Sequence, residues 1–498
     1  MSRGARMIGL TGSEIKVAPP LYPAVPSLRD FTRNWLPVGQ RVHLIGVGGC
    51  GMRGAAEMLL RRGAIVSGSD RAASDATAIL ASHGAKVYTT QAADHLPESC
   101  HLVVYSAAIK ETNPELAEAR RRGYPVMKYS QLLGLLMAQQ TGLAIAGTHG
   151  KSTTTAMVAY VLRRAGCDPS YVIGAEVEQL GGGSGYGEGE HFVVEACEYD
   201  RSFVNLRPRL AAILNIEEDH LDYYADLDAI EEAFRDFIAL LPADGLLVVN
   251  GEDRNVQRVL AGSVAPVETF GFEGNFNWRA NILDSNNGCI RFEVWRGDRV
   301  LTEVAMSIPG RHNASNALAA MALCFRAGVE PETIAKALGE FGGAGRRLTL
   351  RGSVAGVTVV DDYAHHPTEI QVTLRAARDF YRPRKMFVVF QPHQHSRTRC
   401  LLNDFARSFG SADLVIVPDI FFVRDSESER DLIDSIDLVE RIHAQGGEAR
   451  YEKSFERIVM QLGREVREGD LVITMGAGDV WRMADQLLDC LKQTRSGK

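Results

Sequence analysis

The sequence predicts an α/β protein with largely parallel sheets. Short apolar runs alternate with longer helical stretches over almost the whole chain, which is the pattern of repeated strand–helix–strand units. At two places a glycine-rich loop stands between a predicted strand and a predicted helix. The length of 498 residues corresponds to about three domains of ordinary size.

The composition excludes several classes of protein. Hydrophobic residues make up 45% and charged residues 23% of the chain, the balance of a globular protein rather than a disordered one. The net charge of −7 counts against a general nucleic-acid binder. No apolar run reaches the roughly 18 residues of a membrane span, so we expect neither nucleic acid nor a membrane as partner. The eight cysteines form no CxxC pair and the N-terminus lacks a secretory pattern, so we expect free thiols and a cytoplasmic protein.

The first α/β domain is expected to follow a flexible extension. Residues 1–40 are rich in proline and have no clean periodicity. A break near Gln139–Gly142 places the end of the first domain at residue 141, so that it covers 41–141. Its expected elements are strands at Val42–Val47, Ala64–Ser67 and Leu102–Ser106, and a helix over Gly51–Arg62.

Two further α/β domains are expected after this break. The glycine cluster Gly342–Gly345 separates them, which places the central domain at 142–343 and the C-terminal domain at 344–498. A helix over Ser152–Ala165 follows the first strand of the central domain. The predicted strands are Leu143–Ala146, His191–Glu195, Leu210–Leu214, Leu246–Asn250, Val357–Asp361, Met386–Phe390, Leu414–Val417 and Leu471–Met475.

The first glycine loop has the GxGxxG spacing at Gly46, Gly48 and Gly51. Glycine lets the backbone approach a diphosphate closely, and the N-terminus of the following helix adds aligned N–H groups. Asp70 ends the next strand, where dinucleotide folds place an acidic residue for a ribose hydroxyl. Taken alone, the loop predicts a nucleotide diphosphate such as NAD or FAD, and a turn without a ligand is the alternative.

The second glycine loop carries the GK[ST] core of a P-loop, although Gly147 and Gly150 are closer together than in the usual pattern. Its backbone N–H groups are expected to cradle the phosphates of ATP, and Lys151 to neutralise the β- and γ-phosphates. Ser152 can ligate Mg2+. Two such loops on successive domains favour one site for a nucleotide-linked substrate and one for ATP over a simple dehydrogenase.

Acidic residues and a histidine follow two strands of the central domain. Glu195 ends one strand and precedes Glu198, and the segment after the next strand contains Glu217, Glu218 and His220. The carboxyl ends of parallel strands lie at one edge of a sheet. We therefore expect Glu195 and His220 to hold Mg2+ beside the P-loop. For Glu198, Glu217 and Glu218, a solvated acidic loop is an equal alternative.

Histidines and arginines follow two strands of the C-terminal domain. His365 and His366 stand before a proline, which is typical of a loop that faces a substrate. Zinc is the alternative there, but no cysteine or third histidine has ligand spacing with them. Arg397 could clamp a carboxylate with two hydrogen bonds. For His395 and Arg399, an ordinary surface position is an equal alternative.

From about Arg41 to its C-terminus the chain resembles the Mur ligases, the ATP-dependent amide-forming enzymes of peptidoglycan precursor synthesis. Many motifs stand in one order, which makes the resemblance specific. They are HLIGVGGCGM (His43–Met52), SGSD (Ser67–Asp70), YSAAIKETNPE (Tyr105–Glu115), AGTHGKSTTTAM (Ala146–Met157), EACEYD (Glu195–Asp200), NIEEDHLDYY (Asn215–Tyr224), PGRHNASNALAA (Pro309–Ala320), GRR (Gly345–Arg347), DDYAHHPTEI (Asp361–Ile370) and QPHQHSRT (Gln391–Thr398).

The resemblance implies a three-domain fold, with Rossmann-like N- and C-terminal domains around a central P-loop-type ATPase domain. The first domain would bind a UDP moiety, the second ATP with Mg2+, and the third would admit the amino acid. The implied reaction joins L-alanine to the lactyl carboxylate of UDP-N-acetylmuramate through an acyl phosphate. The alternative is a recycling ligase that attaches a whole tripeptide to the same sugar nucleotide. A monomer or a homodimer is expected.

The resemblance also implies roles for single residues. Lys151, Glu195, His220 and His366 would be catalytic, with His366 a candidate for the base that deprotonates the incoming amine. Ser152, Glu195 and His220 would hold the metal. The nucleotide would lie against Gly147, Thr148, Gly150, Lys151, Ser152, Thr153, Asn313, Asn316, Arg347 and Asp362. The substrates would lie against Gly48, Gly49, Gly51, Met52, Asp70, Ser106, His366 and Arg397.

The motifs depart from the family pattern at four positions. Gln394 stands where the pattern PHRxxRT has an arginine, which removes one expected carboxylate clamp. Ser152 replaces a threonine and keeps the hydroxyl, while Cys197 replaces an aspartate and Ala364 a glycine without removing an obvious charge needed for chemistry. Two alternatives stay open: an NAD-dependent oxidoreductase, from the first glycine loop alone, and a non-catalytic ATP-binding regulator, for which Gln394 is the strongest argument.

Overall fold

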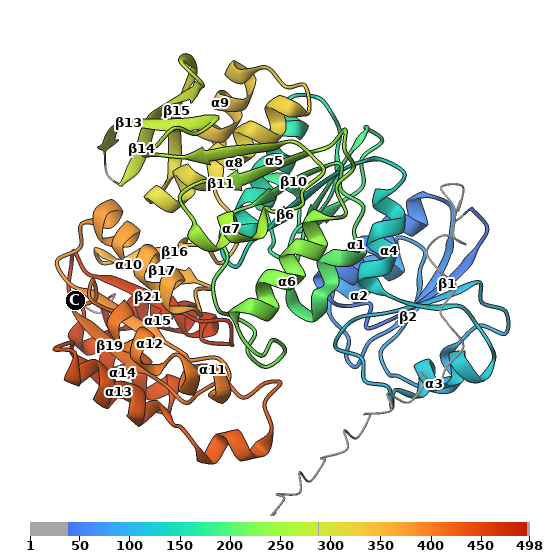
Figure 1. Cartoon of the computed structure of the whole chain (residues 1–498). Helices are drawn as coiled ribbons and strands as arrows, with labels where there is room; N and C mark the ends of the chain where they lie inside the picture. Colours follow the sequence, from blue (N-terminus) through green and yellow to red (C-terminus); the bar gives the residue numbers. More distant parts are fainter. Residues whose placement is uncertain (1–37, 287, 496–498) are drawn as a thin grey trace, which may run out of the picture.

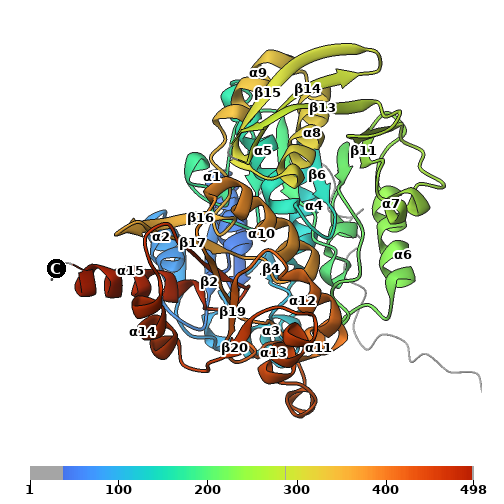
Figure 2. The same cartoon turned by 90° about the vertical axis from the view of Figure 1, so that its left-hand side faces the viewer.

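The computed structural model describes residues 38–286 and 288–495, which form three α/β units around separate sheets of five, ten and six strands (Figures 1 and 2). The predicted α/β class with largely parallel sheets is confirmed. All but the last three residues of the predicted extension 1–40 lie outside the described residues. Among the described residues, no helix has both the length and the apolar character needed to cross a membrane.

The first sheet is fully parallel, with the strand order β3-β2-β1-β4-β5. The winding direction reverses between β1 and β4, and ligands of such sheets bind where the carboxyl ends of these two strands diverge. The elements are β1 (Arg41–Ile45), α1 (Cys50–Arg61), β2 (Ile65–Ser69), α2 (Asp75–Ser82), β3 (Lys86–Tyr88), β4 (Leu102–Tyr105), α3 (Pro114–Arg121), β5 (Val126–Lys128) and α4 (Tyr129–Met137).

The second sheet has the order β15-β14-β13-β12-β11-β10-β6-β9-β7-β8. Strands β12 to β7 of this order are parallel, whereas β13, β14 and β15 form an antiparallel meander that the sequence analysis did not predict. The elements are β6 (Thr141–Ala146), α5 (Lys151–Arg164), β7 (Ser170–Val172), β8 (Ser184–Gly185), β9 (His191–Glu195), β10 (Leu210–Ile213), α6 (Leu227–Ile238), β11 (Leu246–Asn250), α7 (Arg254–Val259), β12 (Val267–Gly271), β13 (Trp278–Asn286), β14 (Cys289–Arg296), β15 (Arg299–Pro309), α8 (Arg311–Arg326) and α9 (Pro331–Glu340).

The central strand β6 shows why the P-loop is held rigidly. Its alternate residues face opposite sides of the sheet because side chains in a strand repeat every two residues. Leu143 and Ile145 belong to the apolar cluster formed with α5, α8 and α9, while Ala144 and Ala146 belong to the cluster formed with α4 and α6. Both faces are therefore buried, and the loop after Ala146 leaves the sheet from a fully packed strand.

The third sheet has the order β16-β17-β21-β18-β19-β20, and only the edge pair β16–β17 is antiparallel. Helices α10, α12 and α13 pack on one face, and α14 and α15 on the other. The elements are β16 (Thr349–Val354), β17 (Val357–Asp362), α10 (Pro367–Tyr381), β18 (Met386–Phe390), α11 (His395–Cys400), α12 (Leu402–Ser408), β19 (Leu414–Val417), α13 (Ser435–Ala444), β20 (Ala449–Tyr451), α14 (Phe455–Glu465), β21 (Leu471–Met475) and α15 (Trp481–Arg495).

The two boundaries between the units differ in chemistry. One apolar cluster runs through the first and the second unit, because Leu132 and Leu136 of α4 pack together with residues such as Phe203 and Phe237. The apolar clusters of the third unit contain only residues from 348 onwards. In Figure 1 the third unit lies beside the second, and its ribbon is separate from that of the first. Its contacts with the second unit include the polar network described next.

Candidate active site

The first glycine loop lies at the carboxyl ends of β1, β2 and β4, as predicted. Gly46 has φ +85°, which favours glycine, and a side chain on it would meet the Ser106 hydroxyl at 3.0 Å. The Gly48 N–H donates to the Asp70 carboxylate at 2.8 Å. Gly48, Asp70 and Ser106 therefore lie close together around this loop.

The other residues predicted for this loop are Gly49, Gly51 and Met52, and each has a different environment. Gly49 is exposed and caps helix α1, whereas a side chain on Gly51 would come within 2.4 Å of the Tyr129 hydroxyl, so Gly51 serves close packing. Met52 is 3% exposed and belongs to the apolar core. Its side chain therefore faces the interior, and only its backbone could contact a substrate, so the predicted substrate role of Met52 stays a prediction.

The P-loop connects β6 to α5 and needs glycine at both predicted positions. Gly147 and Gly150 have φ of +143° and +80°, and a side chain on Gly150 would lie 2.6 Å from the Asn316 amide oxygen. The Thr148 N–H donates to the Asn215 carbonyl at 3.0 Å, which ties the P-loop to the segment after β10. The predicted strand–loop–helix arrangement is thus present.

Lys151 lies at the first position of α5 and reaches back into the P-loop. Its Nζ donates to the carbonyl oxygens of Gly147 and Thr148 at 2.6 and 2.9 Å and to Glu198 Oε1 at 2.9 Å. Burial alone would lower the pKa of Lys151, but the attraction of Glu198 outweighs it and raises the pKa above its ordinary value. Lys151 is therefore charged at neutral pH and fixed where a phosphate group would approach the loop.

Glu198 joins Lys151 to His220 in one buried cluster. Glu198 is 3% exposed, and its Oε1 lies 3.6 Å from His220 Nε2. The solvated loop considered as an equal alternative for Glu198 is therefore excluded. Glu198 Oε2 and His220 Nδ1 are buried and have no hydrogen-bond partner among the described residues. Each is a polar atom that a ligand could satisfy.

Mg2+ fits the donors around Lys151. Glu195 ends β9 and accepts the Gly174 N–H at 2.6 Å, and its charge is one of those that raise the pKa of Lys151. Carboxylate and hydroxyl oxygens are the ligands that Mg2+ prefers. Glu195, Glu198 and the Ser152 hydroxyl supply such oxygens, and one atom each of Glu198 and His220 has no hydrogen-bond partner among the described residues.

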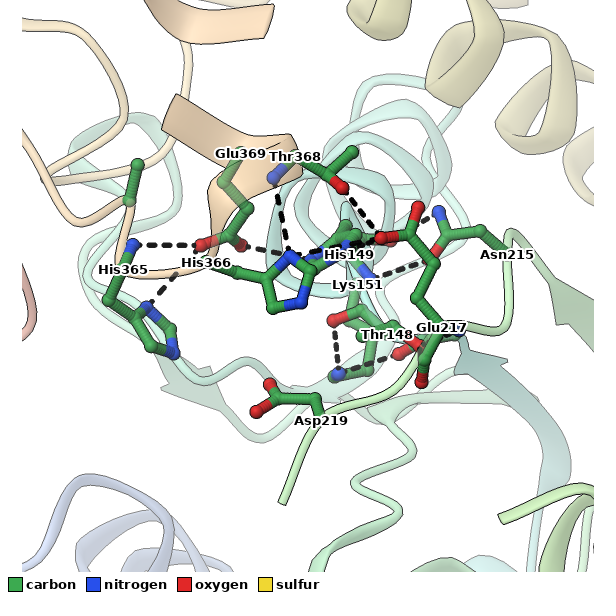
Figure 3. A network of polar contacts seen from close by, with 12 residues as sticks. Thr148, His149, Lys151, Asn215, Glu217, Asp219, His365, His366, Thr368 and Glu369 are labelled. Atoms are coloured by element: carbon green, nitrogen blue, oxygen red, sulfur yellow. Dashed lines mark hydrogen bonds and ion pairs between the residues drawn. The ribbon is translucent and has the colours of Figure 1, made fainter. Parts of the chain in front are cut away.

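A network of polar contacts joins the P-loop to the third unit (Figure 3). His149 lies between two carboxylates, with Nε2 at 3.3 Å from Glu217 and Nδ1 at 3.5 Å from Glu369 of α10. The Thr368 hydroxyl donates to Glu217 at 2.6 Å. Neither His149 nor Glu369 was predicted as a site residue, although both stand inside the motifs quoted above. Their meeting depends on the docking of two units, which no local pattern reveals.

His366 lies in the same network and caps α10. Its Nε2 donates to the Glu218 carbonyl at 3.1 Å and its Nδ1 accepts the Thr368 N–H at 3.3 Å. Burial lowers the pKa of His366, and the neighbouring His149 lowers it further. Both ring nitrogens are engaged in this structure, so the role of His366 as a base stays a prediction.

The structure brings His366, one of the two histidines of the zinc alternative, next to two further possible ligands. His149, Glu217 and His366 place one ligand atom each within 4.8 Å of one another. Burial lowers the pKa of His149, but hydrogen bonds to Glu217 and Glu369 outweigh it and raise the pKa to about 9. In this structure the His149 ring pairs with the carboxylates of Glu217 and Glu369, and zinc at this group stays the alternative.

The network predicts a pH-dependent stability. A folded-state pKa of about 9 lies above the ordinary 6.5, so the stabilising contribution of His149 is complete below pH 6.5 and is lost as the pH rises through 9. We expect native protein to lose about 2–3 kcal/mol more than a His149→Gln variant between pH 6.5 and 9.5. Urea unfolding of both proteins across this range measures the difference. Parallel pH profiles would contradict the assignment.

A cavity of about 450 Å³ opens between the P-loop and the third unit. One side is apolar, with Ile308, Phe380 and Tyr381, and the other is polar, which suits a nucleoside with its phosphates. The predicted nucleotide residues that line it are Gly150, Thr153, Asn313, Asn316, Arg347 and Asp362. Asn313 and Asn316 are hydrogen-bonded to each other at 3.4 Å, so α8 presents a fixed pair of amides.

Arg347 and Asp362 come to this cavity from the third unit. Arg347 Nη1 lies 3.5 Å from Glu369, and its guanidinium stacks on Tyr363. Asp362 accepts the N–H groups of Leu348 and Ala364 at 2.6 and 2.8 Å, and burial raises its pKa to about 6. Both residues therefore line a nucleotide-sized cavity only because the third unit is docked.

Arg397 lies in a second cavity of about 300 Å³, which is also lined by His220. Its Nε and Nη2 donate to Asp219 Oδ1 at 3.1 and 2.7 Å, and both side chains are 8% exposed. Burial alone would raise the pKa of Asp219, but the attraction of Arg397 outweighs it and holds the pKa below its ordinary value. In this structure the guanidinium is thus neutralised by a carboxylate of the protein. Its predicted role as a substrate clamp stays a prediction.

Comparison with protein families matches almost the whole described chain to three domain models. The Mur ligase family catalytic domain matches residues 41–141, the Mur ligase middle domain 145–324, and the Mur ligase glutamate ligase domain 346–478. The matched ranges follow one another without overlap.

Individual proteins and structures are similar over nearly their full lengths. UDP-N-acetylmuramate–L-alanine ligase of Caldanaerobacter subterraneus is 41% identical over 90% of this chain and 97% of its own, and that of Agathobacter rectalis is 42% identical over the same shares. The structure of UDP-N-acetylmuramate–alanine ligase from Thermotoga maritima matches with TM-score 0.76 at 26% identity, covering 92% of this chain and 100% of that one. A murein peptide ligase from Psychrobacter arcticus matches with TM-score 0.69 at 26% identity, covering 91% and 99%.

Proposed function

The chain belongs to the Mur ligase family, and from this premise we propose that it joins L-alanine to the lactyl carboxylate of UDP-N-acetylmuramate at the expense of ATP. The products are UDP-N-acetylmuramoyl-L-alanine, ADP and phosphate, so the enzyme is an ATP-dependent amide-forming ligase of peptidoglycan synthesis. Relatives that carry this activity in their names are 41% and 42% identical over 90% of the chain. We divide the chain accordingly into domains 41–141, 142–343 and 344–498.

One observation carries the proposal most directly. A charged lysine in a P-loop, an acidic residue and a histidine form one buried cluster, and a nucleotide-sized cavity and an arginine-containing cavity lie beside it. ATP-dependent ligation needs such neighbouring sites, because one carboxylate must react first with the γ-phosphate of ATP and then with the amine of the amino acid. An oxidoreductase would have no use for this cluster.

The reaction proceeds through an acyl phosphate. The lactyl carboxylate attacks the γ-phosphorus, ADP leaves, and the amine of L-alanine then attacks the activated carbonyl and expels phosphate. Lys151 stabilises the negative charge that develops on the transferred group, and the P-loop N–H groups orient the phosphates. Arg347 and Asp362 complete the nucleotide site from the C-terminal domain. Mg2+ bound by Ser152, Glu195 and His220, with Glu198 beside them, would neutralise phosphate charge.

We place the reaction in the cytoplasm. The described cysteine side chains are all free thiols, which suits a reducing compartment, and the reaction consumes ATP. A monomer or a homodimer stays a prediction.

Phosphate release from ATP and Mg2+ tests the proposal. We expect release only when UDP-N-acetylmuramate and L-alanine are both present, with the amide product identified by mass spectrometry. L-Alanyl-γ-D-glutamyl-meso-diaminopimelate replaces L-alanine in a parallel reaction. Release with the tripeptide alone would shift the assignment to recycling. No release with either acceptor, despite bound ATP, would support a regulatory protein instead.

A further inference from the structure

Three possible metal ligands meet where the central and C-terminal domains touch (Figure 3). His149 comes from the P-loop, Glu217 from the segment after β10, and His366 from the N-cap of α10. One ligand atom of each lies within 4.8 Å of the other two. The proposed reaction does not use these three side chains as a group, and its magnesium ligands are other residues.

The spacing of these atoms suits a tetrahedral ion. Zn2+ binds imidazole nitrogen and carboxylate oxygen at about 2.0–2.1 Å, so two ligand atoms of a tetrahedral site lie about 3.3–3.4 Å apart. His149 Nε2 lies 3.3 Å from Glu217 Oε2, and His366 Nδ1 lies 3.8 Å from Glu217 Oε2. The widest gap in the group is at most 4.8 Å, so binding requires it to close by about 1.4 Å, which rotation of the side chains can supply.

The atoms behind the two imidazoles hold the rings as a metal site needs them. A histidine ligand usually donates its second ring N–H to a carbonyl or a carboxylate, which leaves the lone pair of the first nitrogen for the metal. His366 Nε2 donates to a backbone carbonyl at 3.1 Å, and its Nδ1 carries a lone pair that accepts the Thr368 N–H at 3.3 Å. His149 Nδ1 lies 3.5 Å from the Glu369 carboxylate, so its Nε2 faces Glu217.

We propose that His149, Glu217 and His366 form a Zn2+ site that locks the central and C-terminal domains together. Two imidazoles and one carboxylate with an open fourth position are a ligand set of zinc, whereas Mg2+ prefers oxygen ligands. At neutral pH the metal must displace the proton that His149 holds between its carboxylates, so we expect micromolar rather than tighter affinity. A bound ion would oppose the separation of the two domains and inhibit turnover reversibly.

Calorimetric titration with ZnCl2 in excess Mg2+ tests the site directly. The free thiols of the chain also bind Zn2+, so the site is counted as the difference between native protein and variants. We expect His149→Gln and His366→Gln each to bind one Zn2+ per chain fewer, because affinity at the site falls at least about 100-fold. His365→Gln is the matched control and should bind Zn2+ as native protein does, because His365 is the adjacent histidine and lies outside the group.

Hydrogen exchange without substrates distinguishes a lock from binding to one domain. In native protein we expect Zn2+ to slow amide exchange at least about 10-fold both in the P-loop and in the first turn of α10, with no change in α2 of the first domain. Neither histidine variant should show this protection. Thermal unfolding identifies a variant that is damaged, and Glu217→Gln, which keeps the size of the side chain and both imidazoles, then replaces it.

Turnover gives a third reading, which rests on the proposed function. Zn2+ should slow phosphate release by the native enzyme at saturating Mg2+, and a zinc-selective chelator should restore it. Equal Zn2+ stoichiometry in native protein and all three ligand variants would overturn the site. Protection of the P-loop without α10 would overturn the lock, and full turnover with the site occupied would overturn the inhibition. A native enzyme that releases no phosphate would overturn the proposed function, whereas titration and hydrogen exchange would still decide the zinc site.

Discussion

We expect the Lys151→Met variant to release phosphate about 1,000-fold more slowly than the native enzyme. Methionine keeps most of the length of the side chain and removes the charge. Lys151 Nζ lies within 2.9 Å of two P-loop carbonyl groups, so no other ammonium group can take its place without moving the loop. The negative charge that develops on the transferred phosphoryl group then loses a fixed counter-charge, and the barrier rises.

Steady-state phosphate release at saturating substrates measures this loss, and equilibrium unfolding shows whether the fold is intact. Lys336→Met on α9 serves as the control, because Lys336 is exposed and far along the chain from the P-loop motifs. We expect it to keep native turnover. Turnover of Lys151→Met within tenfold of native would show that Lys151 has no role in phosphoryl transfer.

The Arg397→Met variant should be destabilised by about 3–5 kcal/mol at neutral pH. The change leaves the Asp219 carboxylate buried without its guanidinium partner. Attraction to Arg397 holds the pKa of Asp219 low, so this stabilising contribution is present above the ordinary aspartate pKa of 3.8 and is lost as the pH falls through the folded-state pKa. In the variant the guanidinium no longer offsets burial, so burial raises the pKa of Asp219, the carboxyl takes up a proton as the pH falls towards 3.8, and the penalty shrinks.

Urea unfolding without substrates measures this penalty apart from any effect on binding. Arg399→Met removes the more exposed pair with Glu429 and should cost less than about 1 kcal/mol. The double variant Arg397→Met/Asp219→Leu replaces both charges by apolar groups and should recover most of the loss. An unchanged stability in Arg397→Met, or a double variant no better than the single one, would contradict this account.

The fold was predictable where strands are short, apolar and buried on both faces. The predicted strands His191–Glu195, Leu246–Asn250 and Met386–Phe390 agree residue for residue with the structure. The meander β13–β15 was missed because its strands alternate between core and solvent, as in Cys289–Arg296. Charged residues on the exposed side of the meander interrupt the apolar ones, so a search for continuous apolar runs does not detect these strands. Three-residue strands such as β3 are too short to give any signal.

The site was predictable where one segment carries the chemistry. The P-loop is local, so Gly147, Gly150 and Lys151 could be assigned from their spacing. Glu198 could not be separated from a solvated acidic residue, because its burial depends on Lys151 and His220 reaching it from other segments.

The two boundaries between the units set which parts of the molecule can separate during each turnover. Parting the first two domains would expose the leucines of α4 and the phenylalanines packed on them to water, which is costly whatever the nucleotide state. The network from His149 to Glu369 and the Arg397–Asp219 pair are different, because water can replace much of what the protein groups lose. The same charged groups that hold the second and third domains together therefore also allow the two domains to separate again. We therefore expect ADP and product to leave where the second and third domains meet, without exposure of the core shared by the first two.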